Sequence, residues 1–190
     1  MLTEEQKYNN KKQYLEYLTK LGVDLTNFMK FLEEVDFFNK PASVQYTKAY
    51  AGGLCEQSLQ LAAELGVLCN AYYPGRYTSE DILKVALFKD LYRSVMYESY
   101  LKNVKDDITG QWISVEAFRT KDGSNRIVFG ELGMSSYMLA KKFFDFTDEQ
   151  IEAIIYSRPN DFAPDIHDVL RQYPLVTLTR MADMVVNYLN

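Results

Sequence analysis

Few side chains of this chain suit nucleophilic catalysis or transition-metal binding. The only histidine is His167, and a lone histidine beside a Pro-containing loop is more often an incidental surface residue than a catalytic group. Neither Ser58 nor Ser157 has a histidine base near it in the sequence, so a hydroxyl nucleophile of the triad type is not supported. The Gly52-Gly53 pair lacks the Lys-Ser or Lys-Thr and the preceding strand of a phosphate-binding loop. Any chemistry therefore depends on carboxylates, amides and basic side chains.

The two cysteines, Cys55 and Cys69, lie in one apolar run that is expected to be helical. Fourteen residues along a helix separate them by roughly 21 Å, which is too far for a disulfide bond. Their number and spacing also exclude a cysteine zinc site. We expect two buried, free thiols.

The composition indicates a globular domain with an acidic exterior. The chain has 190 residues, of which 47% are hydrophobic and 25% charged, as in a domain that buries a core. Its net charge of −5 disfavours nucleic acid and anionic membranes as partners. The start, Met1-Leu2-Thr3-Glu4-Glu5, is unlike a signal peptide, and no apolar run approaches the roughly 20 residues that span a bilayer. We expect a cytoplasmic protein without a membrane partner.

Hydrophobic periodicity and capping motifs predict an all-α, mainly helical fold. We expect helices at about 3–20, 24–36, from 52 onward, 78–102, 132–144, 147–156 and 166–189, the last interrupted near Pro174. Two apolar runs, at 113–117 and 127–129, flank an Asp-Gly turn and predict a two-stranded β-hairpin at about 111–130. The predicted architecture is one helical domain, residues 23–190, with this inserted hairpin. An N-terminal helix, residues 1–22, precedes it as a candidate partner surface.

Five stretches share an order and flanking residues that resemble a known family. They lie at residues 46–59, 86–91, 129–133, 156–158 and 179–184, and include Gly52-Gly53-Leu54 and Ala182-Asp183-Met184. This frame resembles the HD-domain phosphohydrolases, most closely the small HD proteins encoded by bacteriophages. The resemblance covers roughly residues 35 to 189. It implies an HD-domain-like helical bundle.

The resemblance also implies where a metal site would lie. Enzymes of this family hold one or two divalent metals with histidines and aspartates, and a bound water attacks a phosphate ester. Each histidine position of the frame is substituted in this chain, and the residues found there are Thr47, Gln57, Lys89, Glu131, Ser157 and Arg180. Of the metal-binding core, only Asp90 and Asp183 remain. We therefore expect no metal cofactor.

Two interpretations of the remnant pocket stay open. Lys89 would take the metal's place beside Asp90 and Asp183, making the pocket a structural ion-pair cluster. Alternatively, Lys89, Arg93 and Arg180 would converge with Arg158 to hold a phosphate without metal, with the candidate ligand-binding set completed by Gln57, Glu131 and Thr47.

The preferred hypothesis is a catalytically inactive, phage-encoded HD-like protein of the host cytosol. It would act by binding a host protein or a phosphorylated small molecule, and a host protein would contact the Tyr-rich first helix and the hairpin. The alternative is a nucleotide phosphohydrolase with a remodelled site. In that case Asp90, Asp183, Glu131 and Gln57 would hold Mg²⁺ or Mn²⁺ weakly.

Overall fold

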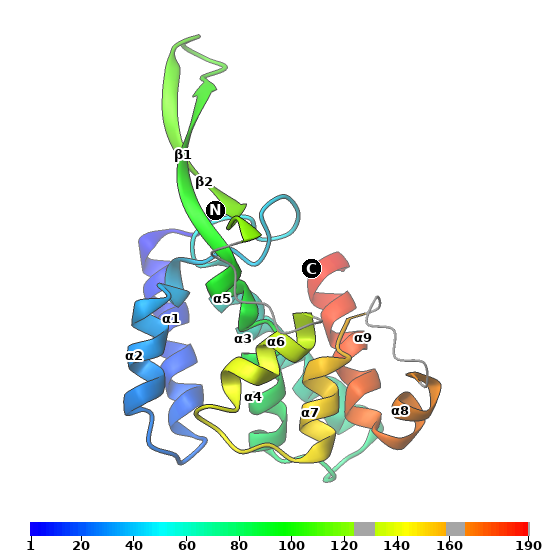
Figure 1. Ribbon diagram of the computed structural model, residues 1–190. Coiled ribbons are helices and arrows are strands. Elements are labelled where there is room, and N and C mark those ends of the chain that lie inside the picture. The colour runs from blue at the N-terminus through cyan, green and yellow to red at the C-terminus, as the bar shows by residue number, and fades with distance from the viewer. Residues whose placement is uncertain (124–131, 159–165, 190) are drawn as a thin grey trace.

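The computed structural model describes residues 1–123, 132–158 and 166–189, and these residues form a mainly helical body with a two-stranded antiparallel sheet (Figure 1). The helices are α1 (Glu4–Thr19), α2 (Thr26–Glu34), the 3₁₀ turn η1 (Phe37–Asn39), α3 (Gly53–Tyr72), α4 (Ser79–Phe88), α5 (Tyr92–Met96), α6 (Leu132–Ala140), α7 (Asp148–Ile155), α8 (Ile166–Gln172) and α9 (Pro174–Tyr188). The predicted helical class with an inserted hairpin is confirmed. No helix in the described residues is long and apolar enough to cross a bilayer.

Three helices begin at the threonines that the sequence marks as N-caps. Thr3, Thr78 and Thr147 each accept a hydrogen bond from the third backbone N–H of their helix, and the side chain of that third residue bonds back to the cap. These capping boxes satisfy N–H groups that the first turn leaves without helical partners. Gln150, the third residue of α7, also donates to Asp81 Oδ1 of α4 at 2.7 Å, so the starts of α4 and α7 are linked.

Helix α3 forms the centre of the body, in contact with α1, α4 and α9. It begins at Gly52-Gly53, as predicted: Gly52 has φ +86°, a conformation that favours glycine, and a Cβ on Gly53 would meet the backbone oxygen of Lys48. Helix α1 is part of the same core, because Tyr14 and Leu18 are fully buried. Tyr14 donates a hydrogen bond to the backbone oxygen of Leu87 at 3.2 Å.

A second centre of packing is aromatic. Phe28 of α2 meets Phe88 at the end of α4 and Phe144 after α6, with ring centroids 5.5 and 4.9 Å apart in edge-to-face geometry. Helices α6 and α7 approach closely at Gly133, where an added Cβ would contact the backbone of Ile155. Both cysteines are buried and free, as expected.

The position of the hairpin corrects the sequence prediction. Its strands are β1 (Tyr97–Lys105) and β2 (Trp112–Thr120), so residues 97–102 are extended rather than the end of a helix. The turn lies at 106–111, where Asp106 Oδ1 accepts the backbone N–H groups of Ile108 and Thr109. An Asx-type turn of this kind reverses the chain, and it precedes the Asp122-Gly123 turn that the sequence favoured. The predicted strand at 127–129 lies outside the described residues.

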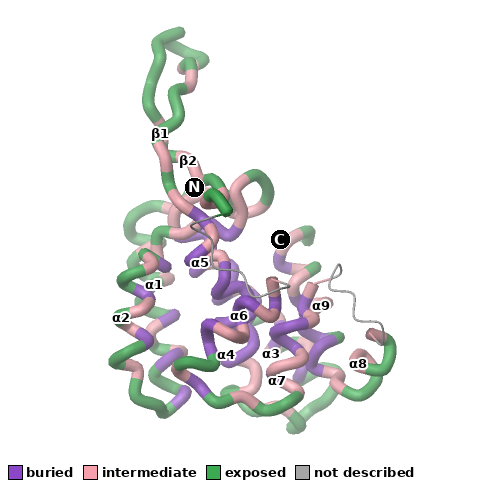
Figure 2. Tube along the Cα trace, viewed as in Figure 1, coloured by how far each residue is buried: buried purple, intermediate pink, exposed green. Residues whose placement is uncertain are grey.

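The hairpin projects beyond the helical body. Figure 2 shows buried residues concentrated between the helices, whereas the outer part of the hairpin is exposed or half-buried. Its base is anchored to the described part of the body through Tyr97, which is buried, and through Lys121, whose backbone N–H donates to the backbone oxygen of Met96.

Candidate functional site

The site is built around a tight corner between α4 and α5. The amide of Lys89 still bonds to Val85 and ends α4, while the amide of Arg93 bonds to the oxygen of Asp90 in the first turn of α5. This corner therefore presents Lys89, Asp90 and Arg93 from one short segment. Gln57 from α3, Arg158 just after α7 and Asp183 from α9 complete the group.

Lys89 lies between two carboxylates in the interior. Its Nζ is 2.6 Å from Asp90 Oδ2 and 2.7 Å from Asp183 Oδ1. The Lys89 side chain is 0% exposed, that of Asp90 4% and that of Asp183 16%. A single ammonium thus bridges α9 to the α4–α5 corner at the place where the resemblance implies a metal.

Asp90 is the most heavily contacted charge in the group. Its Oδ2 accepts from Lys89 and from Gln57 Nε2, the latter at 3.2 Å. Its Oδ1 accepts from Arg93 Nε and from Arg158 Nη2, both at 3.0 Å. Four donors satisfy a carboxylate that water does not reach, as a buried charge requires.

These contacts control the pKa of the carboxyl group. Burial by itself would raise the pKa of Asp90, but Arg93, Lys89 and Arg158 together lower it well below its usual range. Asp90 in turn raises the pKa of Arg93 against the effect of burial. Asp90 is therefore ionised at neutral pH, and Arg93 keeps its charge.

Among the described residues, the cluster has more cations than carboxylates. Three cations, Lys89, Arg93 and Arg158, face the two carboxylates of Asp90 and Asp183. Arg93 uses Nε for Asp90, and no acceptor among the described residues contacts its terminal nitrogens. Its side chain is 14% exposed.

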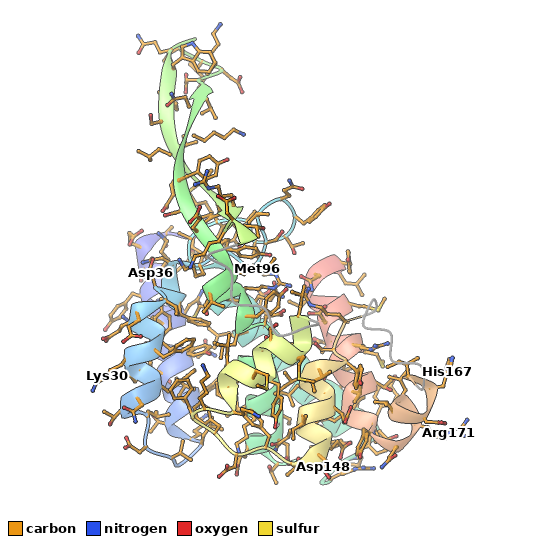
Figure 3. All side chains as sticks on the ribbon, in the orientation of Figure 1. Lys30, Asp36, Met96, Asp148, His167 and Arg171 are labelled. Atoms are coloured by element: carbon orange, nitrogen blue, oxygen red, sulfur yellow. The ribbon has the colours of Figure 1, made fainter. Side chains whose placement is uncertain are left out.

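Three other predicted residues bond elsewhere. Thr47 donates to Asn187 Oδ1 at 3.0 Å, Ser157 donates to the backbone oxygen of Ile154, and Arg180 Nε donates to the backbone oxygen of Tyr156 at 2.6 Å. Their elements border the cluster, but these bonds do not reach Asp90. Glu131 lies outside the described residues. His167 lies exposed on α8 (Figure 3).

Two residues near the cluster were not anticipated. Tyr92 lies under both guanidinium groups, with Arg158 Cζ 4.9 Å and Arg93 Cζ 5.9 Å from its ring centroid, and burial raises the pKa of Tyr92 to about 12. Its position next to Arg93 in the sequence was the one feature that could have indicated this contact. Lys48 is a further nearby cation, whose Nζ donates to the backbone oxygen of Val186 at 3.3 Å. Burial lowers the pKa of Lys48, while the carboxylates of Glu56 and Asp183 oppose this shift by favouring the charged form.

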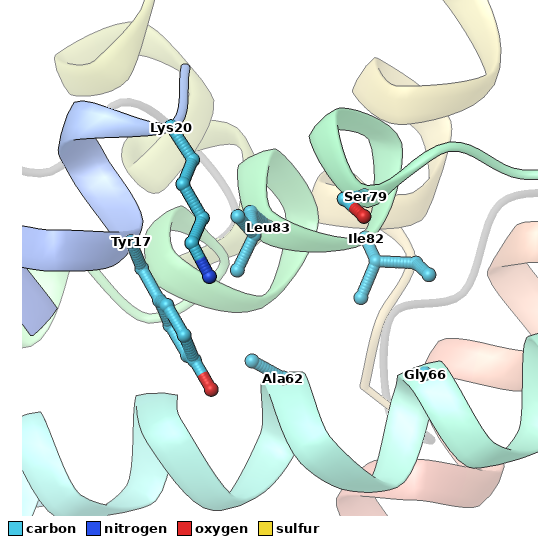
Figure 4. A pocket seen from close by; sticks show the side chains of 7 residues that line it. All are labelled: Tyr17, Lys20, Ala62, Gly66, Ser79, Ile82 and Leu83. Carbon is cyan, nitrogen blue, oxygen red and sulfur yellow. The ribbon is translucent and has the colours of Figure 1, made fainter. Parts of the chain in front are cut away.

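A separate hollow of about 220 Å³ lies between α1, α3 and α4 (Figure 4). Its floor includes Gly66, whose missing side chain leaves open space, and the ammonium of Lys20 lies 5.0 Å from the ring of Tyr17 at its edge. None of the ion-pair cluster's residues lines it.

The chain was also compared with known proteins. No family model, curated protein or solved structure matches it.

The pH dependence of stability tests the electrostatic role of Asp90. Its folded pKa lies below the unfolded value of about 3.9, so its charge stabilises the fold above that pH and the stabilisation is lost as pH falls toward the folded pKa. We expect Asp90→Asn to lower the free energy of unfolding by about 3 kcal/mol at neutral pH. The deficit should shrink below about pH 4, as measured by urea unfolding across a pH series.

Asp107→Asn, at an exposed residue of the hairpin turn, is the matched control and should follow the wild type throughout. An Asp90→Asn deficit that stays constant from neutral to about pH 2.5 would contradict the electrostatic assignment.

Proposed function

We propose that this chain is a catalytically inactive HD-domain-like protein, encoded by a bacteriophage, that acts in the host cytosol by binding rather than by hydrolysis. The observation that carries the proposal is the buried ammonium of Lys89 between Asp90 and Asp183. It supplies a fixed positive charge where the family's enzymes would hold a metal and its reactive water. A lysine can neutralise two carboxylates there, but it cannot lower the pKa of a bound water as a metal ion does.

The residues present do not fit a divalent cation. Magnesium and manganese need several oxygen ligands, whereas both carboxylates here already form ion pairs with Lys89, and Asp90 also with two arginines. A cation next to Lys89 would meet strong repulsion in a site with little water. The remodelled phosphohydrolase is therefore the less favoured function.

A phosphorylated small molecule is the ligand that the cluster suits best. Arg93 offers terminal donors that no described residue engages, beside the Arg158 guanidinium. Planar guanidinium groups recognise phosphate through paired hydrogen bonds. Gln57 adds a buried Oε1 atom with no hydrogen-bond partner among the described residues, which an N–H or O–H group of the ligand could satisfy.

A host protein is the second candidate partner. Helix α1 is buried on one face, but Tyr8 on that helix is 68% exposed. Tyrosine contributes both apolar area and a hydrogen-bonding group to protein interfaces. The exposed face of α1 therefore remains a proposed contact surface.

An activity screen tests the absence of hydrolysis. With Mg²⁺ or Mn²⁺ supplied, we expect no turnover of nucleotides, phosphomonoesters or phosphodiesters, because no activated water is available. Isothermal titration should detect no tight binding of either metal. One tightly bound equivalent of metal, with turnover that Asp90→Ala abolishes, would establish the remodelled phosphohydrolase instead.

Ligand binding is tested by Arg93→Met. We expect inorganic phosphate, pyrophosphate or one of a nucleotide panel to raise the melting temperature of the wild type. Loss of the Arg93 donors should weaken that binding about tenfold or more, since hydrogen bonds to charged groups contribute about 1.5–3 kcal/mol. Each variant is compared with its own ligand-free baseline.

Arg171→Met, on the exposed surface of α8, is the control and should bind like the wild type. Equal stabilisation of the Arg93 and Arg171 variants would remove Arg93 from the site. A lack of stabilisation of the wild type by every probe would exclude the phosphorylated ligand.

A further inference from the structure

The β-hairpin carries several large apolar side chains that are exposed to solvent. Leu101 is 75% exposed, Ile108 95%, Trp112 72% and Ile113 42%. They belong to β1, β2 and the turn between them, and this hairpin projects from the helical body (Figures 1 and 2). A two-stranded hairpin is at best marginally stable in water, and a third strand or a covering element is normally required.

Within the part of the chain that the structure describes, both outer edges of this hairpin are open. β1 and β2 pair over nine residues each, from Tyr97 opposite Thr120 to Lys105 opposite Trp112, and no further strand joins them among the described residues. Each outer edge therefore presents backbone N–H and C=O groups that can pair with another strand. Exposed edges of this length are usually protected by charges, prolines or bulges.

The two edges differ in that protection. β1 carries Glu98, Lys102 and Lys105 among its nine residues. The nine residues of β2 carry two charges, Glu116 and Arg119, and neither proline nor glycine; the segment from Trp112 to Phe118 has only Glu116. β2 is thus the edge that is less protected against pairing.

The segment of β2 from Trp112 to Phe118 reads the same by side-chain class in both directions. Around Val115, the order is aromatic, aliphatic, polar, aliphatic, polar, aliphatic, aromatic, as given by Trp112, Ile113, Ser114, Val115, Glu116, Ala117 and Phe118. If a second strand of the same sequence paired antiparallel with β2, centred on Val115, each residue would stand opposite a residue of the same side-chain class. We infer that the partner of β2 is a second copy of this chain, and that the two hairpins form a four-stranded sheet across a two-fold axis at Val115.

This register satisfies both faces of the sheet. On one face, Val115 meets its own copy, and Ile113 meets Ala117 of the second chain. On the other face, Trp112 meets Phe118 of the second chain at both ends, an aromatic pairing that stabilises antiparallel sheets. No like charges stand directly opposite one another within this segment. The same patch serves both copies, as a two-fold interface requires.

The test uses opposite charges at the centre of the pairing. Wild-type full-length protein should sediment near twice the mass of one chain and dissociate on dilution through the micromolar range. Val115→Lys and Val115→Glu should each be monomeric, because two like charges would face each other across the axis. An equimolar mixture of the two variants should regain the dimer mass, since Lys then faces Glu.

Val104→Lys is the matched control: it lies on the same face of the hairpin but on β1, opposite Ile113, and it should dimerise like the wild type. The mixing result also separates lost pairing from a damaged hairpin, which mixing would not repair. A wild type that stays monomeric at all concentrations would overturn the inference. So would dimeric Lys and Glu variants, or a mixture that remains monomeric.

Discussion

The structure depends on one buried carboxylate, Asp90, and on the four donors that surround it. Transfer of an ionised carboxylate into the interior is costly unless it is paired and hydrogen-bonded. Here Lys89 and Arg93 come from the same corner, while Gln57 and Arg158 come from α3 and from the end of α7. Lys89 then reaches Asp183 on α9. Segments far apart in the sequence are therefore joined at a single charged centre. Each buried charge depends on partners from the other segments to offset the cost of its burial.

That centre limits what the chain can do chemically. A metal ion in such a position would polarise a phosphate and generate a nucleophile. An ammonium balances the charge of two carboxylates but has neither effect. The terminal donors of Arg93, which no described residue engages, are better suited to holding an anion. The proposed binding function follows from this difference between a lysine and a metal.

Local signals in the sequence predicted much of the helical framework. The capping boxes at Thr3, Thr78 and Thr147 need only neighbouring residues, and all three helices begin there. The sequence prediction misplaced the hairpin because strand pairing depends on residues far apart in the sequence. The local pattern of residues 97–102 predicts a helix, and these residues are extended because they pair with β2. The turn at Asp106 depends on one side chain that accepts hydrogen bonds from the backbone. Its sequence signal is weaker than that of the Asp122-Gly123 pair.

The candidate site was only partly accessible to sequence reasoning. The frame resemblance grouped Gln57, Lys89 and Asp90 with Asp183, and these side chains do lie together. The contacts of Thr47 and Arg180 could not be foreseen, because they depend on which neighbouring backbone or amide group lies nearest. Nor did periodicity reveal Tyr92 as the surface under two guanidinium groups.

The most direct measurement is the free energy of unfolding of Lys89→Met at neutral pH, with Lys30→Met on the exposed face of α2 as the reference (Figure 3). If Lys89 balances both carboxylates, its loss should cost about 3–5 kcal/mol, because Asp183 loses its ion-pair partner and Asp90 one of three. Lys30→Met should stay within about 0.5 kcal/mol of the wild type. A Lys89→Met variant as stable as the wild type would contradict the central role of this ammonium.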